Sequence, residues 1–201
     1  MKGNGSQKKS KRYAMLIDLR RCLGCHSCAV ACKSENDVPL GVYRTWVKTV
    51  EKGSYPNVRR VFIPSLCNNC ERPACLSVCP VKATYRRPDG IVMIDEHRCI
   101  GCKYCMAACP YDARHVNPVK KIVQKCTFCF HRVDAGLVPS CVNTCPGGAR
   151  VFGDVNDPES EISRLIATNA IQVLKPEKGT EPRVFYIGLD EMAAKTRVEE
   201  A

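Results

Sequence analysis

The arrangement of the cysteines constrains this chain more than any other feature of its sequence. The 201 residues include sixteen cysteines, which fall into four groups of four with none left over. The groups are Cys22, Cys25, Cys28 and Cys32; Cys67, Cys70, Cys75 and Cys79; Cys99, Cys102, Cys105 and Cys109; and Cys126, Cys129, Cys141 and Cys145. So dense and regular a set must either cross-link a small fold or bind metal.

The spacing within the groups is of two kinds. The first and third groups read CxxCxxCxxxC, a run in which three thiolates bind one iron-sulfur cluster and the fourth reaches a different one. The second and fourth groups are variants that read CxxCxxxxCxxxCP and CxxCx11CxxxCP. Proline follows the last cysteine in three groups, whereas Lys33 follows Cys32 in the first group. The spacing predicts iron-sulfur ligation and one-electron chemistry.

Zinc and disulfides explain this spacing less well. A zinc ribbon needs two CxxC pairs per metal, and a third cysteine three residues further on has no place in its tetrahedral site. A disulfide framework would not require regular steps of three residues. The zinc alternative would be a zinc-stabilised module that binds nucleic acid or protein. Its colour would distinguish it from an iron-sulfur protein, because zinc proteins are colourless and iron-sulfur proteins are brown.

The first and third groups lie in longer repeats. The segment Ile17–Cys25 parallels Ile94–Cys102, which indicates duplicated units. A β-rich segment, Tyr13–Asp18 or Ile91–Asp95, precedes each group, and small residues before the last cysteine favour a short helix. The sequence therefore predicts small strands and helices around loops that bind metal.

The charge and the remaining composition set limits on the partners. The formal charge is +11, but a 4Fe-4S cluster with four thiolates carries about −2, so four clusters would leave about +3. We therefore expect no nucleic-acid partner. No run of eighteen apolar residues exists, so we expect no transmembrane segment. The basic stretch Met1–Arg12 is not followed by the apolar segment of an export signal, and Arg20-Arg21 lies inside the first cysteine motif.

The sequence continues after the last cysteine group with a segment of different character. Asp157–Glu159 is expected to cap a helix through Ile162–Asn169, and Arg183–Gly188 is expected to form a strand. An independent ferredoxin would not need this extension. We expect it to pack along the cluster-binding domain and a partner subunit.

These motifs in this order resemble the four-cluster iron-sulfur subunits of complex molybdenum enzymes of the dimethyl sulfoxide, polysulfide and tetrathionate reductase type. The resemblance covers Tyr13 to about Asp190. It depends most on the four groups and on five further segments: Leu40–Arg44, Asn68–Glu71, Ala108–Tyr111, Lys125–Cys129 and Val184–Gly188.

The resemblance implies an α+β fold of two pseudo-symmetric bacterial ferredoxin-like halves, each holding two 4Fe-4S clusters, with loop-rich linkers. Residues 1–12 would be a basic N-terminal tail. Residues 13–58 and 119–155 would form one half from cysteine groups one and four, and residues 59–118 an inserted half from groups two and three. Residues 156–201 would be a C-terminal extension for subunit docking.

The resemblance also implies the ligand sets of four 4Fe-4S clusters. Cluster 1 would be bound by Cys22, Cys25, Cys28 and Cys145; cluster 2 by Cys67, Cys70, Cys75 and Cys109; cluster 3 by Cys99, Cys102, Cys105 and Cys79; and cluster 4 by Cys126, Cys129, Cys141 and Cys32. Some relatives have another residue at the position of Cys102 and hold a three-iron cluster. Cysteine here predicts four irons.

The implied function is electron transfer without catalysis by the chain itself. A subunit of this type would relay electrons between an integral-membrane quinone-reactive subunit and a molybdopterin catalytic subunit, and the expected direction is from quinol to a sulfur compound or oxyanion. The alternative is a polyferredoxin, or a relay subunit of a hydrogenase or formate dehydrogenase. The expected location is the outer, periplasmic face of the cytoplasmic membrane, held there through partners, with the cytoplasmic face as the alternative.

Overall fold

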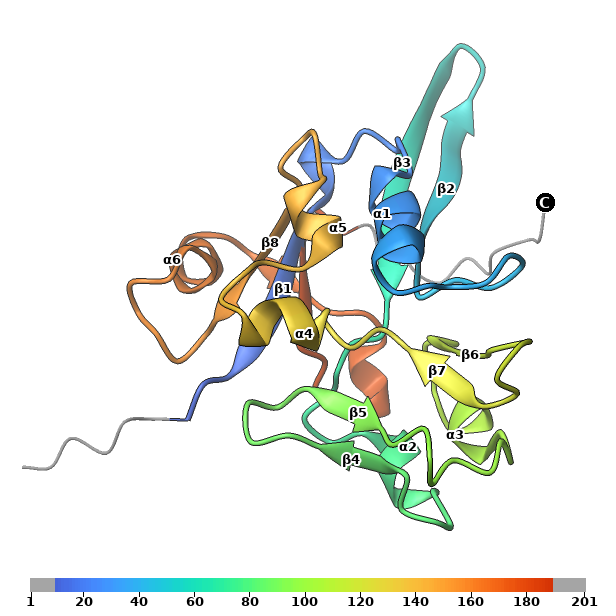
Figure 1. Cartoon of the computed structure of the whole chain (residues 1–201). Coiled ribbons are helices and arrows are strands. Elements are labelled where there is room, and N and C mark those ends of the chain that lie inside the picture. Colours follow the sequence, from blue (N-terminus) through green and yellow to red (C-terminus); the bar gives the residue numbers. More distant parts are fainter. Residues whose placement is uncertain (1–9, 190–201) are drawn as a thin grey trace, which may run out of the picture.

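A computed structural model describes residues 10–189 of the chain (Figure 1). Most of the basic N-terminal tail and the end of the C-terminal extension lie outside the described residues. The strands are β1 Tyr13–Asp18, β2 Thr45–Ser54, β3 Asn57–Leu66, β4 Thr84–Arg86, β5 Val92–Ile94, β6 Arg114–Val116, β7 Val123–Lys125, β8 Arg150–Asp154, β9 Ile171–Gln172 and β10 Val184–Ile187. The helices are α1 Ser27–Glu35, α2 Ala74–Ser77, α3 Tyr104–Ala107, α4 Phe130–Asp134, α5 Ser140–Asn143 and α6 Glu161–Thr168, with 3-10 turns η1 Leu19–Arg21 and η2 Pro176–Lys178.

The largest sheet has four strands in the order β8-β1-β10-β9. Strand β1 runs antiparallel to β8 and parallel to β10, with Ile17 opposite Tyr186. The apolar run of β1 explains its central place, since Met15, Leu16 and Ile17 have no exposed surface. The predicted strand Tyr13–Asp18 is confirmed. The predicted C-terminal strand is also confirmed, and it completes the sheet that the N-terminal strand begins.

Three antiparallel hairpins make up the rest of the strand structure in residues 10–189. Strands β2 and β3 pair over ten residues each and project from the body at the upper right of Figure 1. The pairs β4-β5 and β6-β7 are short, and with α2 and α3 they lie together at the bottom of the same view. The long hairpin was not predicted from the sequence.

The core lies on both faces of the main sheet. On one face, Ala14 and Leu16 pack with Ile162 of α6. On the other face, Met15 and Ile17 pack with Tyr186 and with several cysteines. Helix α6 begins one residue before the predicted start. Its N-cap is Ser160, whose hydroxyl accepts a hydrogen bond from the Ser163 N–H. The predicted cap at Asp157–Glu159 is therefore wrong.

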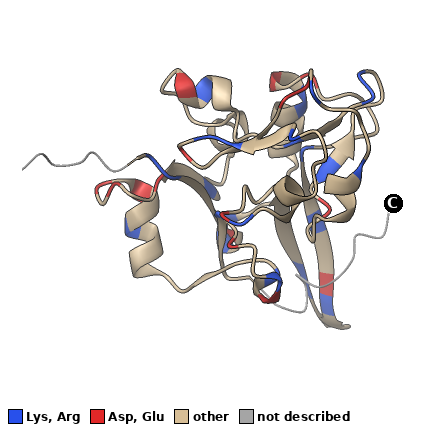
Figure 2. Cartoon of the chain, turned by 90° about the horizontal axis from the view of Figure 1, so that it is seen from below, with Lys and Arg blue, Asp and Glu red and all other residues tan. Residues whose placement is uncertain are grey.

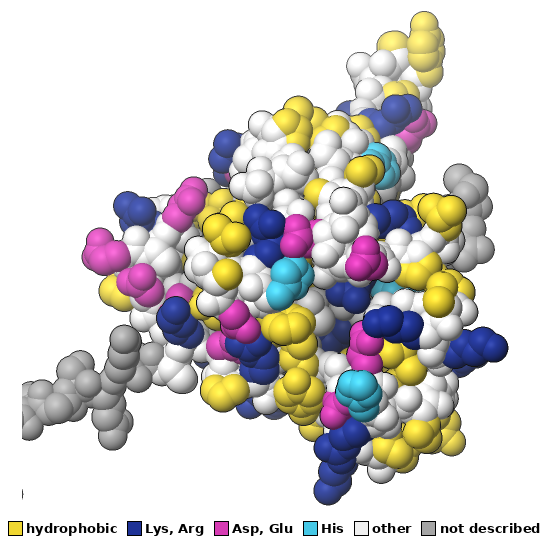
Figure 3. All heavy atoms as spheres, viewed as in Figure 1, with side chains coloured by type: hydrophobic (Ala, Val, Ile, Leu, Met, Phe, Trp, Pro, Cys, Tyr) yellow, Lys and Arg dark blue, Asp and Glu magenta, His cyan; other side chains and the backbone are white. Residues whose placement is uncertain are grey.

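These elements give a mixed fold of short helices and small sheets, as the α+β prediction requires. No helix in residues 10–189 is long and apolar enough to cross a bilayer. Basic residues are distributed over the whole fold instead of forming one patch (Figure 2). On the face shown in Figure 3, basic, acidic and hydrophobic side chains are intermixed, and the end of the long hairpin carries the exposed Tyr55 and Val58.

Candidate metal centres

Four hollows in the described part of the protein are each lined by four cysteines. Site 1 has Cys22, Cys25, Cys28 and Cys145; site 2 has Cys67, Cys70, Cys75 and Cys109; site 3 has Cys79, Cys99, Cys102 and Cys105; and site 4 has Cys32, Cys126, Cys129 and Cys141. All sixteen cysteines are free of disulfides. The structure thus brings together, round each hollow, the four cysteines of one expected ligand set.

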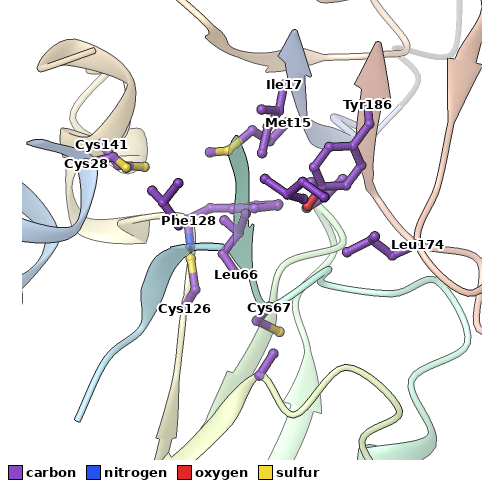
Figure 4. Close-up of a cluster of buried hydrophobic side chains, with 14 of the residues drawn as sticks. Met15, Ile17, Cys28, Leu66, Cys67, Cys126, Phe128, Cys141, Leu174 and Tyr186 are labelled. Atoms are coloured by element: carbon purple, nitrogen blue, oxygen red, sulfur yellow. Dashed lines mark hydrogen bonds between the residues drawn. The ribbon is translucent and has the colours of Figure 1, made fainter. Parts of the chain in front are cut away.

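Helices α1 and α5 explain how two sites come to share their elements. Helix α1 carries Cys28 of site 1 and Cys32 of site 4, one helical turn apart. Helix α5 carries Cys141 of site 4 and is followed by Cys145 of site 1. The two helices pack together, so Cys28 and Cys141 lie side by side (Figure 4). Each helix therefore serves two sites.

Helices α2 and α3 repeat this arrangement for the other two sites. Helix α2 carries Cys75 of site 2 and is followed by Cys79 of site 3. Helix α3 carries Cys105 of site 3 and is followed by Cys109 of site 2. The two helices are in contact. The fourth cysteine of each group therefore lies at the neighbouring site, as the CxxCxxCxxxC spacing predicts.

The four sites differ in burial. All four cysteines of site 4 are buried, and so are Cys67 and Cys70 of site 2. Cys126 of site 4 and Cys67 of site 2 belong to one buried cluster and lie close together in Figure 4. Site 1 and site 3 each include an exposed cysteine, Cys25 and Cys102 respectively. The sites therefore form a row in the order 1, 4, 2, 3, with the exposed sites at its ends.

The donor sets suit a metal cluster better than a single ion. Within residues 10–189, no three His, Cys, Asp or Glu side chains converge as ligands of one metal ion. The sulfurs instead surround a hollow, as the four iron corners of a 4Fe-4S cluster require. Burial raises the pKa of Cys32 and of Cys70 to about 12, so these thiols would release their protons only to a strong counter-charge such as iron.

Backbone N–H groups point at several of the sulfurs. The N–H of Ala83 donates to Cys79 Sγ at 3.2 Å, and the N–H of Ala149 donates to Cys145 Sγ at 3.3 Å. Both alanines lie four residues after the cysteine that they contact. Such donors stabilise the negative charge on a ligated thiolate.

Sequence reasoning missed several polar side chains that contact the sites, among them two arginines and an asparagine. Arg150 and Arg114 are buried and donate to cysteine sulfurs, and Asn36 Nδ2 lies 3.7 Å from the sulfurs of both Cys32 and Cys129. A signal for the arginines was present, since groups three and four both end in Cys-Pro-x-x-Ala-Arg. Because the sequence contains many basic residues, it does not show which of them are buried.

The histidines differ in their surroundings. His26 is exposed at the rim of site 1, and Lys103 is exposed at the equivalent place in site 3. His131 Nε2 lies 2.7 Å from Glu35 Oε1. His115 is half-buried, and burial together with Arg44 and Lys33 lowers its pKa to about 4, which keeps it neutral at physiological pH.

Comparison with known proteins gives consistent matches. Residues 58–155 match the family described as the 4Fe-4S dicluster domain. A tetrathionate reductase subunit of Salmonella typhimurium is 54% identical over 184 residues, covering 90% of this chain and 74% of that protein.

Two further relatives have similar coverage. A polysulfide reductase chain of Wolinella succinogenes is 42% identical over 181 residues, covering 89% of this chain and 95% of the relative. A putative dimethyl sulfoxide reductase iron-sulfur subunit of Halobacterium salinarum is 43% identical over 205 residues, covering 87% and 78%. The similarity therefore extends over nearly the whole sequence, not over the cysteine motifs alone.

Proposed function

The protein belongs to the family of iron-sulfur subunits of tetrathionate, dimethyl sulfoxide and polysulfide reductases, and on this basis we propose that it relays single electrons through four 4Fe-4S clusters within a respiratory reductase. Its partners would be a molybdopterin catalytic subunit and an integral-membrane quinone-reactive subunit. The substrate would be a sulfur compound or a similar oxyanion, reduced at the expense of quinol.

The observation that carries the proposal is the set of four hollows, each lined by four cysteines. Cys22, Cys25, Cys28 and Cys145 would hold cluster 1; Cys67, Cys70, Cys75 and Cys109 cluster 2; Cys99, Cys102, Cys105 and Cys79 cluster 3; and Cys126, Cys129, Cys141 and Cys32 cluster 4. When bound, such clusters supply reversible one-electron oxidation and reduction. The protein's own residues would bind the clusters, bury the cluster at site 4 most deeply and set the charge around all four.

The exchange of cysteines between helices supports the division into two ferredoxin-like halves. Residues 13–58 and 119–155 would form the half with sites 1 and 4, and residues 59–118 the half with sites 2 and 3. In each half, one pair of short helices contacts and shares both sites. The extension from residue 156 would help to dock a partner.

Both ends of the row have features suited to docking. Leu23 and Ile100 occupy equivalent positions in the repeated loops, beside the exposed Cys25 and Cys102, and they are 64% and 65% exposed. An exposed aliphatic side chain beside an exposed ligand suits a partner surface that excludes water there. One end would face each partner, on the outer face of the cytoplasmic membrane.

The test is the metal and sulfide content of the anaerobically purified complex, with electron paramagnetic resonance during a redox titration. We expect about sixteen irons and about sixteen sulfides per chain. Zinc with little iron would overturn the proposal. Native size measurement then tests the partners, because a free polyferredoxin would elute alone. Leu23→Glu should release one partner and Ile100→Glu the other, while Val119→Glu, at an exposed valine outside the cysteine loops, should release neither.

A further inference from the structure

Arg150 at the start of β8 lies between two cysteine sites. The residue is 3% exposed. Its guanidinium donates to Cys28 Sγ of site 1 at 3.3 Å and to Cys141 Sγ of site 4 at 3.6 Å. The same group donates to Thr45 Oγ1 at 3.0 Å, and Thr45 is itself buried. One buried cation thus contacts a ligand of each site in its half.

Arg114 at the start of β6 has the same position in the other half. The residue is 5% exposed. Its guanidinium donates to Cys75 Sγ of site 2 at 2.7 Å and to Thr84 Oγ1 at 3.4 Å. Cys105 of site 3 also lies within electrostatic reach of the Arg114 guanidinium. Again one guanidinium faces both sites of a half, and a buried threonine holds it.

The two arginines are equivalent in sequence as well as in space. Each lies five residues after the last cysteine of its group, in Cys-Pro-x-x-Ala-Arg. In group two the corresponding position is Thr84, which is the residue that accepts from Arg114. In group one that pattern is absent, and Thr45 of β2 takes the same role toward Arg150. Thr84 and Thr45 thus occupy unrelated positions in the sequence, yet each accepts a hydrogen bond from the arginine of its half.

Neither guanidinium pairs with a carboxylate among residues 10–189. The ion pairs of this part of the protein involve other basic residues, most of them at least partly exposed. A buried cation without an acidic partner is costly unless another anion compensates it. The thiolates of the two sites are the anions at hand.

We propose that Arg150 and Arg114 are potential-setting residues, each of which raises the reduction potentials of both clusters in its own half. The inference rests on the proposed ligand sets. An electron added to a cluster adds negative charge beside the guanidinium, so the cation stabilises the reduced form more than the oxidised form. Because one cation acts on two sites, the two potentials of a half shift together.

The experiment is a redox titration, monitored by electron paramagnetic resonance, of the chain purified anaerobically with its native partners. At a fixed applied potential, Arg150→Gln should raise the ratio of oxidised to reduced cluster about tenfold at sites 1 and 4, equivalent to about 59 mV for a one-electron couple. Sites 2 and 3 should keep their wild-type ratios. Arg114→Gln should give the converse pattern, and Arg150→Lys, which keeps the charge, should restore most of the wild-type ratio.

Thr45→Val provides a milder change in case Arg150→Gln does not bind all its iron. It removes the hydroxyl that holds the guanidinium and keeps the charge, so the ratio at sites 1 and 4 should rise by no more than about fivefold, which corresponds to the usual worth of one hydrogen bond. The inference is wrong if fully loaded variants show no shift, an equal shift at all four sites, or the same shift for lysine as for glutamine. Low iron in the wild-type protein would instead refute the proposed relay itself.

Discussion

Glu71 joins three distant parts of the chain, and replacing it with glutamine should destabilise the fold. Its carboxylate accepts hydrogen bonds from Arg183 next to β10, from Arg12 at 3.0 Å and from Arg86 of β4 at 2.6 Å. Burial would raise the pKa of Glu71, but the hydrogen bond and charge of Arg183, with the charges of Arg12 and Arg86, hold that pKa below its ordinary value. The substitution Glu71→Gln keeps the shape and removes the charge.

The expected loss follows from the burial of the partners. The side chain of Arg183 is 7% exposed and that of Glu71 is 25% exposed, so the variant leaves a buried cation without its counter-ion. Breaking a buried pair in this way lowers the free energy of unfolding by about 3 to 5 kcal/mol. Because Glu71 is partly exposed, we expect a loss at the lower end of this range, about 3 kcal/mol. The pairs with Arg12 and Arg86 are more exposed and add little. For a protein of this size, about 3 kcal/mol lowers Tm by about 6 to 12 °C.

The assay is thermal unfolding of the iron-loaded protein at one scan rate, followed by far-ultraviolet circular dichroism. Glu51→Gln is the matched control, because Glu51 and Arg60 form an exposed pair on the long hairpin, 2.6 Å apart. The control should lose about 0.5 kcal/mol or less. If Glu71→Gln lowered Tm no more than Glu51→Gln, the account of Glu71 as the counter-ion of the buried Arg183 would be refuted.

Three further predictions concern the metal sites. Cys102→Ser should lower the iron content by about one and produce a three-iron signal, since the exposed Cys102 releases its corner iron to solvent; an unchanged spectrum would mean that Cys102 is not a ligand. Gly101→Ala should cost about 3 kcal/mol of stability, because φ is +69° and a Cβ would lie 2.7 Å from the Lys121 carbonyl oxygen. Gly136→Ala, at φ +78° in open space, should cost only about 1 kcal/mol, and equal losses would contradict the reasoning. Removing iron under reducing conditions should abolish the near-ultraviolet circular dichroism of Trp46, which packs on a core that includes cysteines; an unchanged signal would show that the core forms without metal.

The sequence was most informative where local chemistry decides the structure. The cysteine spacing predicted that three closely spaced thiols face one site and that the fourth reaches another, because a loop of fixed length reaches only a limited distance. Which groups exchange their fourth cysteines was implied by the family resemblance and not by the spacing. The apolar run of residues 13–18 predicted a strand correctly. The strand neighbours of β1 could not be predicted, since β8 and β10 come from far along the sequence and only packing selects them. The burial of Arg114 and Arg150 escaped prediction for the same reason.

The single break in the ferredoxin pattern has a structural reason that the sequence alone did not reveal. Helices α2, α3 and α5 have four residues each, and a Cys-Pro pair follows each of them. Lys33 replaces that proline in group one, so α1 continues past Cys32 to Glu35 and has nine residues. Lys33 Nζ donates to the carbonyl oxygens of Pro39 and Val42, which fixes the loop after the helix.

The longer helix brings two residues that follow cysteine group one, Glu35 and Asn36, into contact with the segment of group four. Asn36, the C-cap of α1, reaches the sulfurs of Cys32 and Cys129 of site 4. Glu35 accepts a hydrogen bond from Arg132 at 3.0 Å, on the helix that follows Cys129. A proline at position 33 would end the helix before either contact could form. The departure from the repeat therefore links the two cysteine groups that are farthest apart in the sequence, and it does so at the most deeply buried site of the row.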